Sequence, residues 1–454
     1  MTDSRCLVVT QRTYIAVVME VIASKIVLAI ATALLGGWVA RRPVLPAISP
    51  RKFLGLALGL QVLPAGLLFV AFYVVAGHPV SSDVPGFYVL PGRAVLAGQI
   101  PYRDFGLSYA PLFPYVGASL LYIWDADRAF VVFGMALNVL ALILWHAVAL
   151  RCTSVERARQ ATVLYASSGH VLIQTALGTN QIWVAVALAG SALLIARQQP
   201  AASALVQAVS ACTTKLLALL FWPVLWLCAP RRSTWLMTSV LLTAAVFATF
   251  VLLGADVLDP LRREGEGISS GNLPYLLEPL STSLGKWRYL PYDALAALTL
   301  AAAWLWMYWE TRTWDDVRRA RVLPAALALI GLLFMLFSKK SISGYEVFVM
   351  YPAILVLTGT ALPLGRQVAF LLIFNVLLVA EPSVWFRVGR YQPLSQWMHE
   401  AGLFPLLPFV LTDIALTACY AFLAWLSLRS IQVSGRDAGT ANSESLPAIL
   451  GATS

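Results

Sequence analysis

The sequence predicts an all-α protein that crosses a membrane many times. Of its 454 residues, 59% are hydrophobic and only 12% are charged, and the mean hydropathy is +0.77. A soluble domain carries about 25% charged residues. Apolar runs of about 20 residues, the length that spans a bilayer, recur from one end of the chain to the other. We therefore expect a polytopic membrane protein with roughly 11–13 transmembrane helices.

The expected spans follow one another with short connections. Residues 14–39 are expected as a retained anchor rather than a cleaved signal, because the run is long for a signal core and no clear small-residue cleavage site follows it. Residues 109–124 are apolar but short, and they fit either an interfacial helix or a short span. The other expected spans are 53–76, 129–150, 160–177, 181–196, 202–228, 234–254, 291–309, 322–337, 345–360, 367–380 and 403–428.

The positive charge of the chain indicates membrane orientation rather than nucleic-acid binding. The net charge of +10 comes from short Lys and Arg clusters between apolar runs, which is typical of cytoplasmic loops in inner-membrane proteins. No hydrophilic block is large enough for a second domain, so residues 1–429 are expected as one transmembrane domain. Residues 430–454, rich in Ser, Gly and Ala, are expected as a disordered cytoplasmic tail. The five cysteines lack CxxC spacing and predict no disulfide framework and no metal site.

Two long polar segments are expected on the outer face, at residues 77–108 and 255–290. In the first, Pro91 can open a short helix that lies in the interface. Residues 160–177 and 181–196 are expected to run out and back, which places Gln181 near the outer face. Lys215 interrupts the run 202–228 and would cost about 2.5–3.5 kcal/mol in hydrocarbon. A helix break that opens Lys215 to a water-filled cavity is the simplest remedy.

Asp83 is the candidate catalytic residue because it lies just outside the span 53–76. A carboxylate there can act as a general base on a hydroxyl delivered from the lipid side, and partial desolvation raises its basicity. The alternative is that Asp83 caps the helix that follows it. Asp104 is expected to form local hydrogen bonds, and neither carboxylate belongs to a DxD pair.

Basic and aromatic residues of the outer face are candidates for binding an anionic lipid and a sugar. Lys215, Lys339 and Lys340 oppose the usual charge bias, so they could hold a lipid phosphate and stabilise it as it leaves. The alternative for the lysine pair is snorkelling to headgroups. Tyr88 and Tyr109 could stack on a sugar, or they could belong to the interfacial aromatic belt.

Together these features resemble the GT-C superfamily of membrane glycosyltransferases, and within it glycosyltransferase family 87, the bacterial polyprenol-phosphate-mannose-dependent mannosyltransferases. The likeness covers residues 53–430. Its most specific part is an Asp after the first core span, followed by a Tyr, a small-residue helix, Gly-x-x-Pro-Tyr and Tyr-x-Pro-Leu. The residues that carry the likeness are Asp83, Tyr88, Gly98, Pro101, Tyr102, Tyr109, Ala110, Pro111, Leu112, the turn Gly178, Thr179, Asn180, Gln181, and Lys215 with Pro223.

The resemblance implies a GT-C fold and an inverting transfer that needs neither metal nor cofactor. Asp83 would be the base, and Lys215, Lys339 and Lys340 would face the phosphate of a polyprenyl-phosphate sugar, with mannose first among the sugars. Relatives often carry a histidine near the outer end of a late span, and residues 341–346 have none. The acceptor would be an extracytoplasmic glycolipid or glycan. The substrate-binding residues implied are Tyr88, Arg93, Tyr102, Asp104, Tyr109, Gln181, Lys215, Lys339, Lys340, Tyr345 and Glu346.

Two other classes of protein remain open at this point. A flippase for lipid carriers predicts charges along a central cavity between two similar halves. A polymerase or ligase of lipid-linked glycans predicts a large outer loop with paired arginines, and residues 255–290 contain Arg262 and Arg263. The sequence leaves the sugar, the acceptor and the oligomeric state open.

Overall fold

The computed structural model describes residues 4–42, 45–80, 83–264, 267–389 and 391–436, and every regular element in them is helical. One isolated bridge, between Pro101 and Phe105, is the only strand-like pairing in these ranges. The predicted all-α class is confirmed. Eight helices of the described residues are long and apolar enough to cross a membrane. They are α1 (Ser4–Ala40), α2 (Pro50–Phe69, continued by Val70–Val75), α5 (Arg128–Cys152), α11 (Arg232–Leu252), α14 (Leu290–Thr311), α15 (Asp316–Phe337), α17 (Leu364–Arg387) and α19 (Leu403–Arg436).

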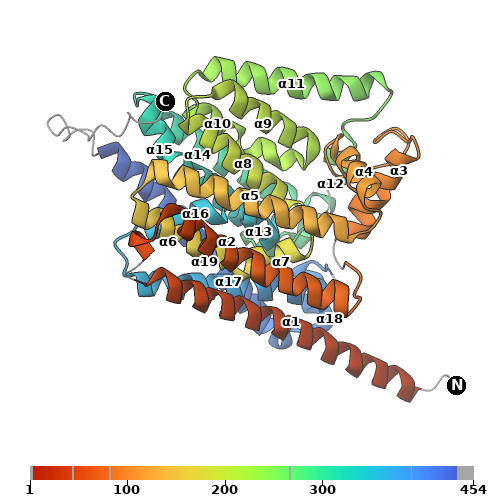
Figure 1. Ribbon diagram of the computed structural model, residues 1–454. Helices are drawn as coiled ribbons and strands as arrows, with labels where there is room; N and C mark the ends of the chain where they lie inside the picture. The colour runs from red at the N-terminus through yellow and green to blue at the C-terminus, as the bar shows by residue number, and fades with distance from the viewer. Residues whose placement is uncertain (1–3, 43–44, 81–82, 265–266, 390, 437–454) are drawn as a thin grey trace.

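The long helices lie side by side, so the bundle has two ends (Figure 1). One end carries α3 (Leu90–Leu96), α4 (Phe113–Ile123) and α12 (Asp259–Glu264), and we call it the loop end. At the other end α5 and α19 terminate and α6 (Val155–Ala166) begins. We call it the arginine end, because Arg151 and Arg157 lie near these helix termini, and Arg321 and Arg429 lie in the first turns of α15 and the last turns of α19.

Helix α15 forms the centre of the bundle. Of its membrane-length window 78% is buried, against 17% for both α11 and α14, which therefore offer most of their surface to lipid. Close packing around α15 depends on small residues: a Cβ added to Gly331 would lie 2.5 Å from Cγ1 of Val349. Helix α19, α14 and α16 (Met350–Thr358) all pack against it.

Several predicted spans are broken helices. Helices α7 (Gly169–Ala176) and α8 (Gln181–Ala196) meet at 119°, and Gly178 between them adopts a φ of +70° that a residue with a side chain rarely takes. This bend confirms the predicted reversal before Gln181. Helix α9 (Pro200–Thr213) stops before Lys215, and the chain continues as η4 (Leu216–Phe221) and α10 (Trp222–Cys228), which confirms the predicted break.

Three sequence expectations need correction. The expected count of spans exceeds the eight long helices, or up to nine with the bent pair, because α4, α10 and α16 are short. The expected span 367–380 is too short, because α17 continues to Arg387 and Glu381, just beyond the expected span, lies inside the helix and is buried. The tail expected from residue 430 begins with helix, since α19 continues to Arg436 and Ile431 is fully buried. Residues 437–454 lie outside the described residues.

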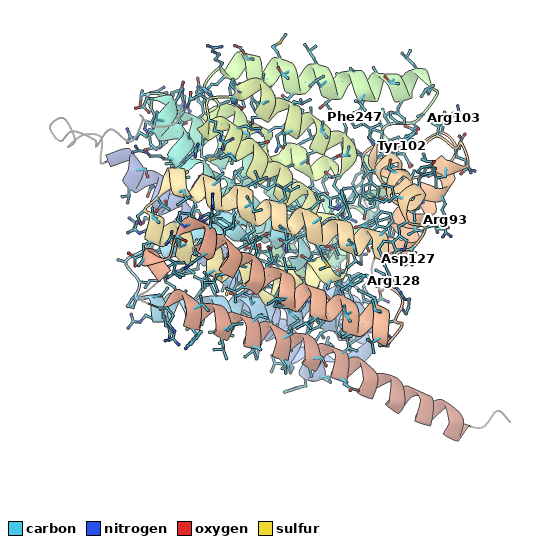
Figure 2. All side chains as sticks on the ribbon, in the orientation of Figure 1. Arg93, Tyr102, Arg103, Asp127, Arg128 and Phe247 are labelled. Carbon is cyan, nitrogen blue, oxygen red and sulfur yellow. The ribbon has the colours of Figure 1, made fainter. Side chains whose placement is uncertain are left out.

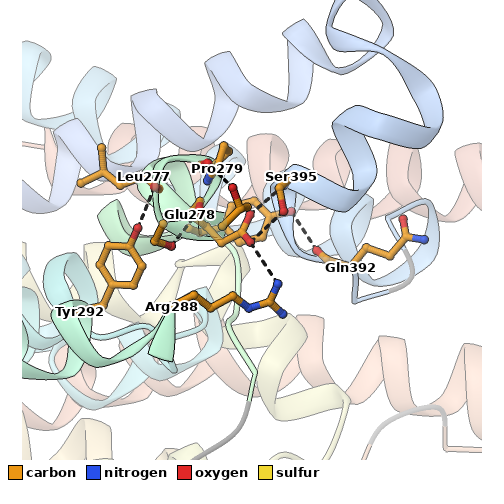
Figure 3. Close-up of polar contacts among 10 residues, drawn as sticks. Leu277, Glu278, Pro279, Arg288, Tyr292, Gln392 and Ser395 are labelled. Carbon is orange, nitrogen blue, oxygen red and sulfur yellow. Dashed lines mark hydrogen bonds and ion pairs between the residues drawn. The ribbon is translucent and has the colours of Figure 1, made fainter. Parts of the chain in front are cut away.

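The second outer segment is fastened to the last loop by a buried carboxylate. Glu278 opens η5 (Glu278–Trp287), and its two oxygens accept hydrogen bonds from the backbone N–H and the hydroxyl of Ser395 in α18 (Leu394–Ala401), both at 2.8 Å (Figure 3). The guanidinium of Arg288 lies 3.8 Å from the same carboxylate. These partners compensate the cost of burying the Glu278 carboxylate. They also hold residues 278–288 against α18.

Candidate functional site

Asp83 stands at the entrance of η3 (Val84–Val89), the π-helical turn that leads into α3. Its backbone carbonyl accepts a hydrogen bond from Phe87 N–H at 2.8 Å, but its side chain makes no capping hydrogen bond. The carboxylate is half-buried and has no hydrogen-bond or ion-pair partner among the described residues. A capping role for the carboxylate therefore lacks the bond that defines it.

Tyr88 and Tyr109 form an aromatic wall beside Asp83. Their rings meet edge to face with centroids 5.7 Å apart, and Tyr109 stacks on Phe113 at 4.4 Å. The Tyr88 hydroxyl accepts a hydrogen bond from Asn180 N–H at 2.9 Å. Burial raises the pKa of both phenols, and the negative charge of Asp83 raises each pKa further. Both rings are buried by other protein atoms, so neither has an exposed face on which a sugar could stack, and they support the neighbouring residues instead.

Lys215 lies next to Tyr109. Its ammonium nitrogen is 5.0 Å from the centroid of the Tyr109 ring and donates a hydrogen bond to the Tyr345 hydroxyl at 3.1 Å. Two backbone hydrogen bonds hold it there: Ala110 N–H to the Thr214 carbonyl at 2.9 Å, and Leu112 N–H to the Cys212 carbonyl at 2.8 Å. The first outer segment is thus joined to the break after α9. We call Asp83, Tyr88, Tyr109, Lys215 and Tyr345 the Tyr109 cluster.

Gln181 and Glu346 lie behind the Tyr109 cluster, inside the bundle. Gln181 begins α8 and is buried with its side-chain oxygen unpaired. Glu346 belongs to η6 (Ser343–Phe348), is fully buried, and its carboxylate oxygens have no hydrogen-bond partner among the described residues. It interacts electrostatically with Tyr165 and Tyr420, which come from α6 and α19. Glu346 therefore faces the bundle interior.

The lysine pair after α15 contacts the second outer segment. The Lys339 ammonium lies 2.7 Å from Oδ2 of Asp293 and 5.2 Å from the Tyr289 ring centroid. The Lys339 carbonyl accepts a hydrogen bond from Ser269 N–H at 2.8 Å. Lys339 is buried with its charge balanced by a carboxylate, which differs from the headgroup snorkelling considered above. Lys340 is half-buried beside it.

Arg93, Tyr102 and Asp104 lie further out on the loop end, where Figure 2 labels Arg93 and Tyr102. Arg93 forms an exposed ion pair with Asp125 at 3.0 Å. The hydrogen bond from Arg103 lowers the pKa of Asp104, which also accepts a bond from Ile100 N–H at 2.7 Å. The predicted local role of Asp104 is confirmed. Tyr102 has a φ of +65° and donates its hydroxyl proton to the Tyr109 carbonyl, so it supports the Tyr109 cluster from outside.

Two residues of this region were not singled out as site residues in the sequence. The pKa of Tyr391 is raised by partial burial and by the charge of Asp83. Asn180 is buried, binds Tyr88 through its backbone, and has both side-chain polar atoms unpaired among the described residues. A buried side-chain amide whose polar atoms have no partner can form hydrogen bonds with a ligand or a water molecule. Asn180 belongs to the turn at residues 178–181, but its bond to Tyr88 joins segments 92 residues apart, which the sequence pattern does not reveal.

The remaining sequence hypotheses have simple structural outcomes. Arg262 of the expected arginine pair is ion-paired with Asp256, while nothing is described for the Arg263 side chain. Within the described ranges, no three His, Cys, Asp or Glu side chains lie close enough together to hold a metal ion. Comparisons with protein-family models, with curated proteins and with solved structures found no match. The candidate site therefore rests on its geometry.

Proposed function

We propose that this protein is a membrane glycosyltransferase that moves a sugar from a polyprenyl-phosphate donor to a hydroxyl of an extracytoplasmic glycolipid or glycan. One observation carries the proposal: two opposite charges act on the same buried residue, Tyr109. The Lys215 ammonium lies 5.0 Å from the Tyr109 ring centroid, and Asp83, a carboxylate without a partner among the described residues, raises the pKa of the Tyr109 phenol. Transfer from a phosphate carrier needs both groups, a base for the incoming hydroxyl and a cation for the departing phosphate.

The roles of the two charged residues follow from the bonds that change. The Asp83 carboxylate takes the proton of the acceptor hydroxyl while that oxygen forms a bond to the anomeric carbon. The bond from the anomeric carbon to the phosphate oxygen breaks, and its electron pair leaves with the polyprenyl phosphate. Lys215 stabilises the added negative charge on that phosphate. Attack opposite the leaving group inverts the anomeric centre.

The orientation of the bundle fits this chemistry. The arginine end carries the helix-terminal arginines of α5, α6, α15 and α19. The bias of Lys and Arg toward the cytoplasm then directs the loop end, with the Tyr109 cluster, to the extracytoplasmic side. Polyprenyl-phosphate sugars offer their sugar at the membrane surface, and the half-buried Asp83, shortly after the apolar helix that ends at Val75, would lie at that surface.

The test is sugar transfer by membranes that contain the Asp83→Asn protein, with radiolabelled polyprenyl-phosphate mannose as donor. Asparagine keeps the size of the side chain but cannot accept the proton, so we expect transfer to fall roughly a hundredfold or more. Asp125→Asn, which removes an exposed carboxylate of the same end, is the matched control and should keep full activity. Equal transfer by wild type and Asp83→Asn would reject Asp83 as the base.

A flippase for lipid carriers is the second candidate, and a specific observation favours it. Glu346, Glu381 and Asp413 are buried in the bundle, and such residues inside a membrane protein often belong to ion or substrate pathways. Reconstituted vesicles distinguish the two classes. Translocation of a fluorescent polyprenyl phosphate without any sugar transfer would favour the flippase, whereas transfer that Asp83→Asn abolishes would favour the glycosyltransferase.

A further inference from the structure

A cavity of about 400 Å³ opens at the arginine end of the bundle, far from the Tyr109 cluster along the helices. It lies where the end of α5 and the start of α6 meet α15, α16 and α19. None of its lining residues belongs to the candidate site, and the proposed reaction does not use them. Its polar lining residues are Cys152, Thr153, Arg157, Arg321, Thr360, Arg429, Ser430 and Ser434.

The charge of this cavity is entirely positive. Arg157, Arg321 and Arg429 come from three different helices, and the lining contains no Asp or Glu. None of the three arginines forms an ion pair in the part of the chain that the structure describes. Asp316, at the start of α15, is paired with Arg319, and Glu310 lies beside Gly435, the residue after the lining residue Ser434. The Arg429 guanidinium lies over the Trp425 ring, with its carbon 5.5 Å from the ring centroid. Three guanidinium groups without a carboxylate partner among the described residues, all in the lining of one hollow, match a phosphate, which they can bind with parallel N–H···O bonds.

One wall of the cavity is apolar, formed by Val322, Leu355, Val356, Leu426 and Val433. Pro324 in the lining has no N–H to give to the carbonyl of Ala320, one turn earlier in α15. The thiol of Cys152 donates to that carbonyl instead, at 3.7 Å. The Ala320 carbonyl is therefore satisfied within the protein, and the apolar residues lie in the same cavity lining as the arginines.

We propose that this cavity binds an anionic phospholipid, with the phosphate between Arg157, Arg321 and Arg429 and part of an acyl chain along the apolar wall. Basic pockets between transmembrane helices at the cytoplasmic surface recognise anionic headgroups in this way. A free phosphate shares the charge but has nothing to place on the apolar wall. The lipid would fasten α6, α15 and α19 together at the end opposite the Tyr109 cluster.

The test is native mass spectrometry of the full chain in detergent, titrated with phosphatidylglycerol, with phosphatidylcholine or with inorganic phosphate. We expect one tightly held phosphatidylglycerol on the wild type. The double variant Arg321→Gln, Arg429→Gln should bind it roughly tenfold more weakly or worse, because each cation near the surface contributes to the attraction. Arg366→Gln, an exposed arginine near the start of α17 and outside the cavity, is the matched control and should bind as the wild type does.

The outcomes that overturn the proposal are distinct. Equal phosphatidylglycerol binding by the double variant and the Arg366→Gln control would show that Arg321 and Arg429 do not bind the lipid. Equal retention of phosphatidylcholine would show that charge is not recognised, and displacement of the lipid by millimolar phosphate would assign the cavity to a free anion. The melting temperature of each delipidated variant, expected to equal that of the wild type, excludes misfolding as the cause of lost binding.

Discussion

The ammonium nitrogen of Lys215 donates a hydrogen bond to the Tyr345 hydroxyl 3.1 Å away, across 130 residues of sequence. This bond joins the break after α9 to η6, the turn that precedes α16. The same ammonium group lies 4.9 Å from the centroid of the Tyr345 ring and 5.0 Å from that of Tyr109. A cation between two aromatic rings is held in place by both of them.

Replacement of Lys215 is expected to slow sugar transfer much more than it weakens the fold. Lys215→Met removes the charge that stabilises the leaving phosphate, so we expect kcat/KM to fall roughly a hundredfold or more. Tyr345→Phe removes only the hydrogen bond that positions the ammonium group and should cost roughly tenfold. Steady-state transfer rates measure both, with Lys286→Met, a lysine over the exposed Trp287 ring, as control. Equal losses in Lys215→Met and the control would contradict a specific role for Lys215.

Tyr88→Phe is expected to destabilise the protein by about 1–3 kcal/mol. The Tyr88 hydroxyl accepts the Asn180 N–H at 2.9 Å, and its loss leaves a buried donor without a partner. Tyr122→Phe is the matched control, because Tyr122 is 85% exposed, and its effect should stay within about 0.5 kcal/mol. Unfolding of both proteins in mixed micelles gives the difference. A Tyr88→Phe protein as stable as the control would mean that another group accepts the hydrogen bond of the Asn180 N–H.

Stability should fall in alkali, and Tyr109 should be one cause. Burial, Tyr88 and Asp83 all raise the pKa of Tyr109 in the folded protein. A raised folded pKa means that the stabilisation is complete below the unfolded pKa of about 10 and is lost as pH rises above it. Melting temperatures between pH about 8 and about 12 should decline less for Tyr109→Phe than for the wild type. Parallel curves of melting temperature against pH for the two proteins would show that Tyr109 ionises as easily in the folded protein as in the unfolded chain.

Gly169→Ala should disrupt the packing of α7 on α1. An added Cβ would lie 2.3 Å from the Cα of Ala29, a backbone atom that cannot rotate away, so a loss of about 1–3 kcal/mol is expected. Gly59→Ala in α2 is the control, because no heavy atom lies within 4 Å of its new Cβ and the change should stabilise the helix by about 0.5–1 kcal/mol. Equal melting temperatures for the two variants would contradict the close approach of α1 and α7.

The sequence predicted those features that depend on local polarity. Long apolar runs predicted the helical bundle, and the high cost of Lys215 in hydrocarbon predicted the break at residues 214–215, which α9 and η4 confirm. The span count was too high because hydropathy does not reveal that α4 is an 11-residue helix and α16 a 9-residue helix.

The candidate site was only partly predictable. Asp83 and Lys215 stand out in the sequence because each is a charge beside an apolar run. Their shared neighbour Tyr109 does not, because a tyrosine in a polar segment looks the same whether it is buried or lies in the interfacial belt. The hydrogen bond of Lys215 with Tyr345 and the electrostatic effect of Asp83 on Tyr391 join segments far apart in the chain, so no local sequence pattern predicts them.

The central position of α15 has a consequence for the order in which the protein can be assembled. The helix on which α10, α14, α16 and α19 pack begins only at Asp316, after about two thirds of the chain has left the ribosome at roughly 5–20 residues per second. Short segments such as α9 and α10 must therefore wait in the bilayer or the translocon with polar groups such as Lys215 still unpartnered by Tyr345. The helices can therefore pack into the complete bundle only late in translation. A chain truncated before residue 316 should be degraded by membrane proteases.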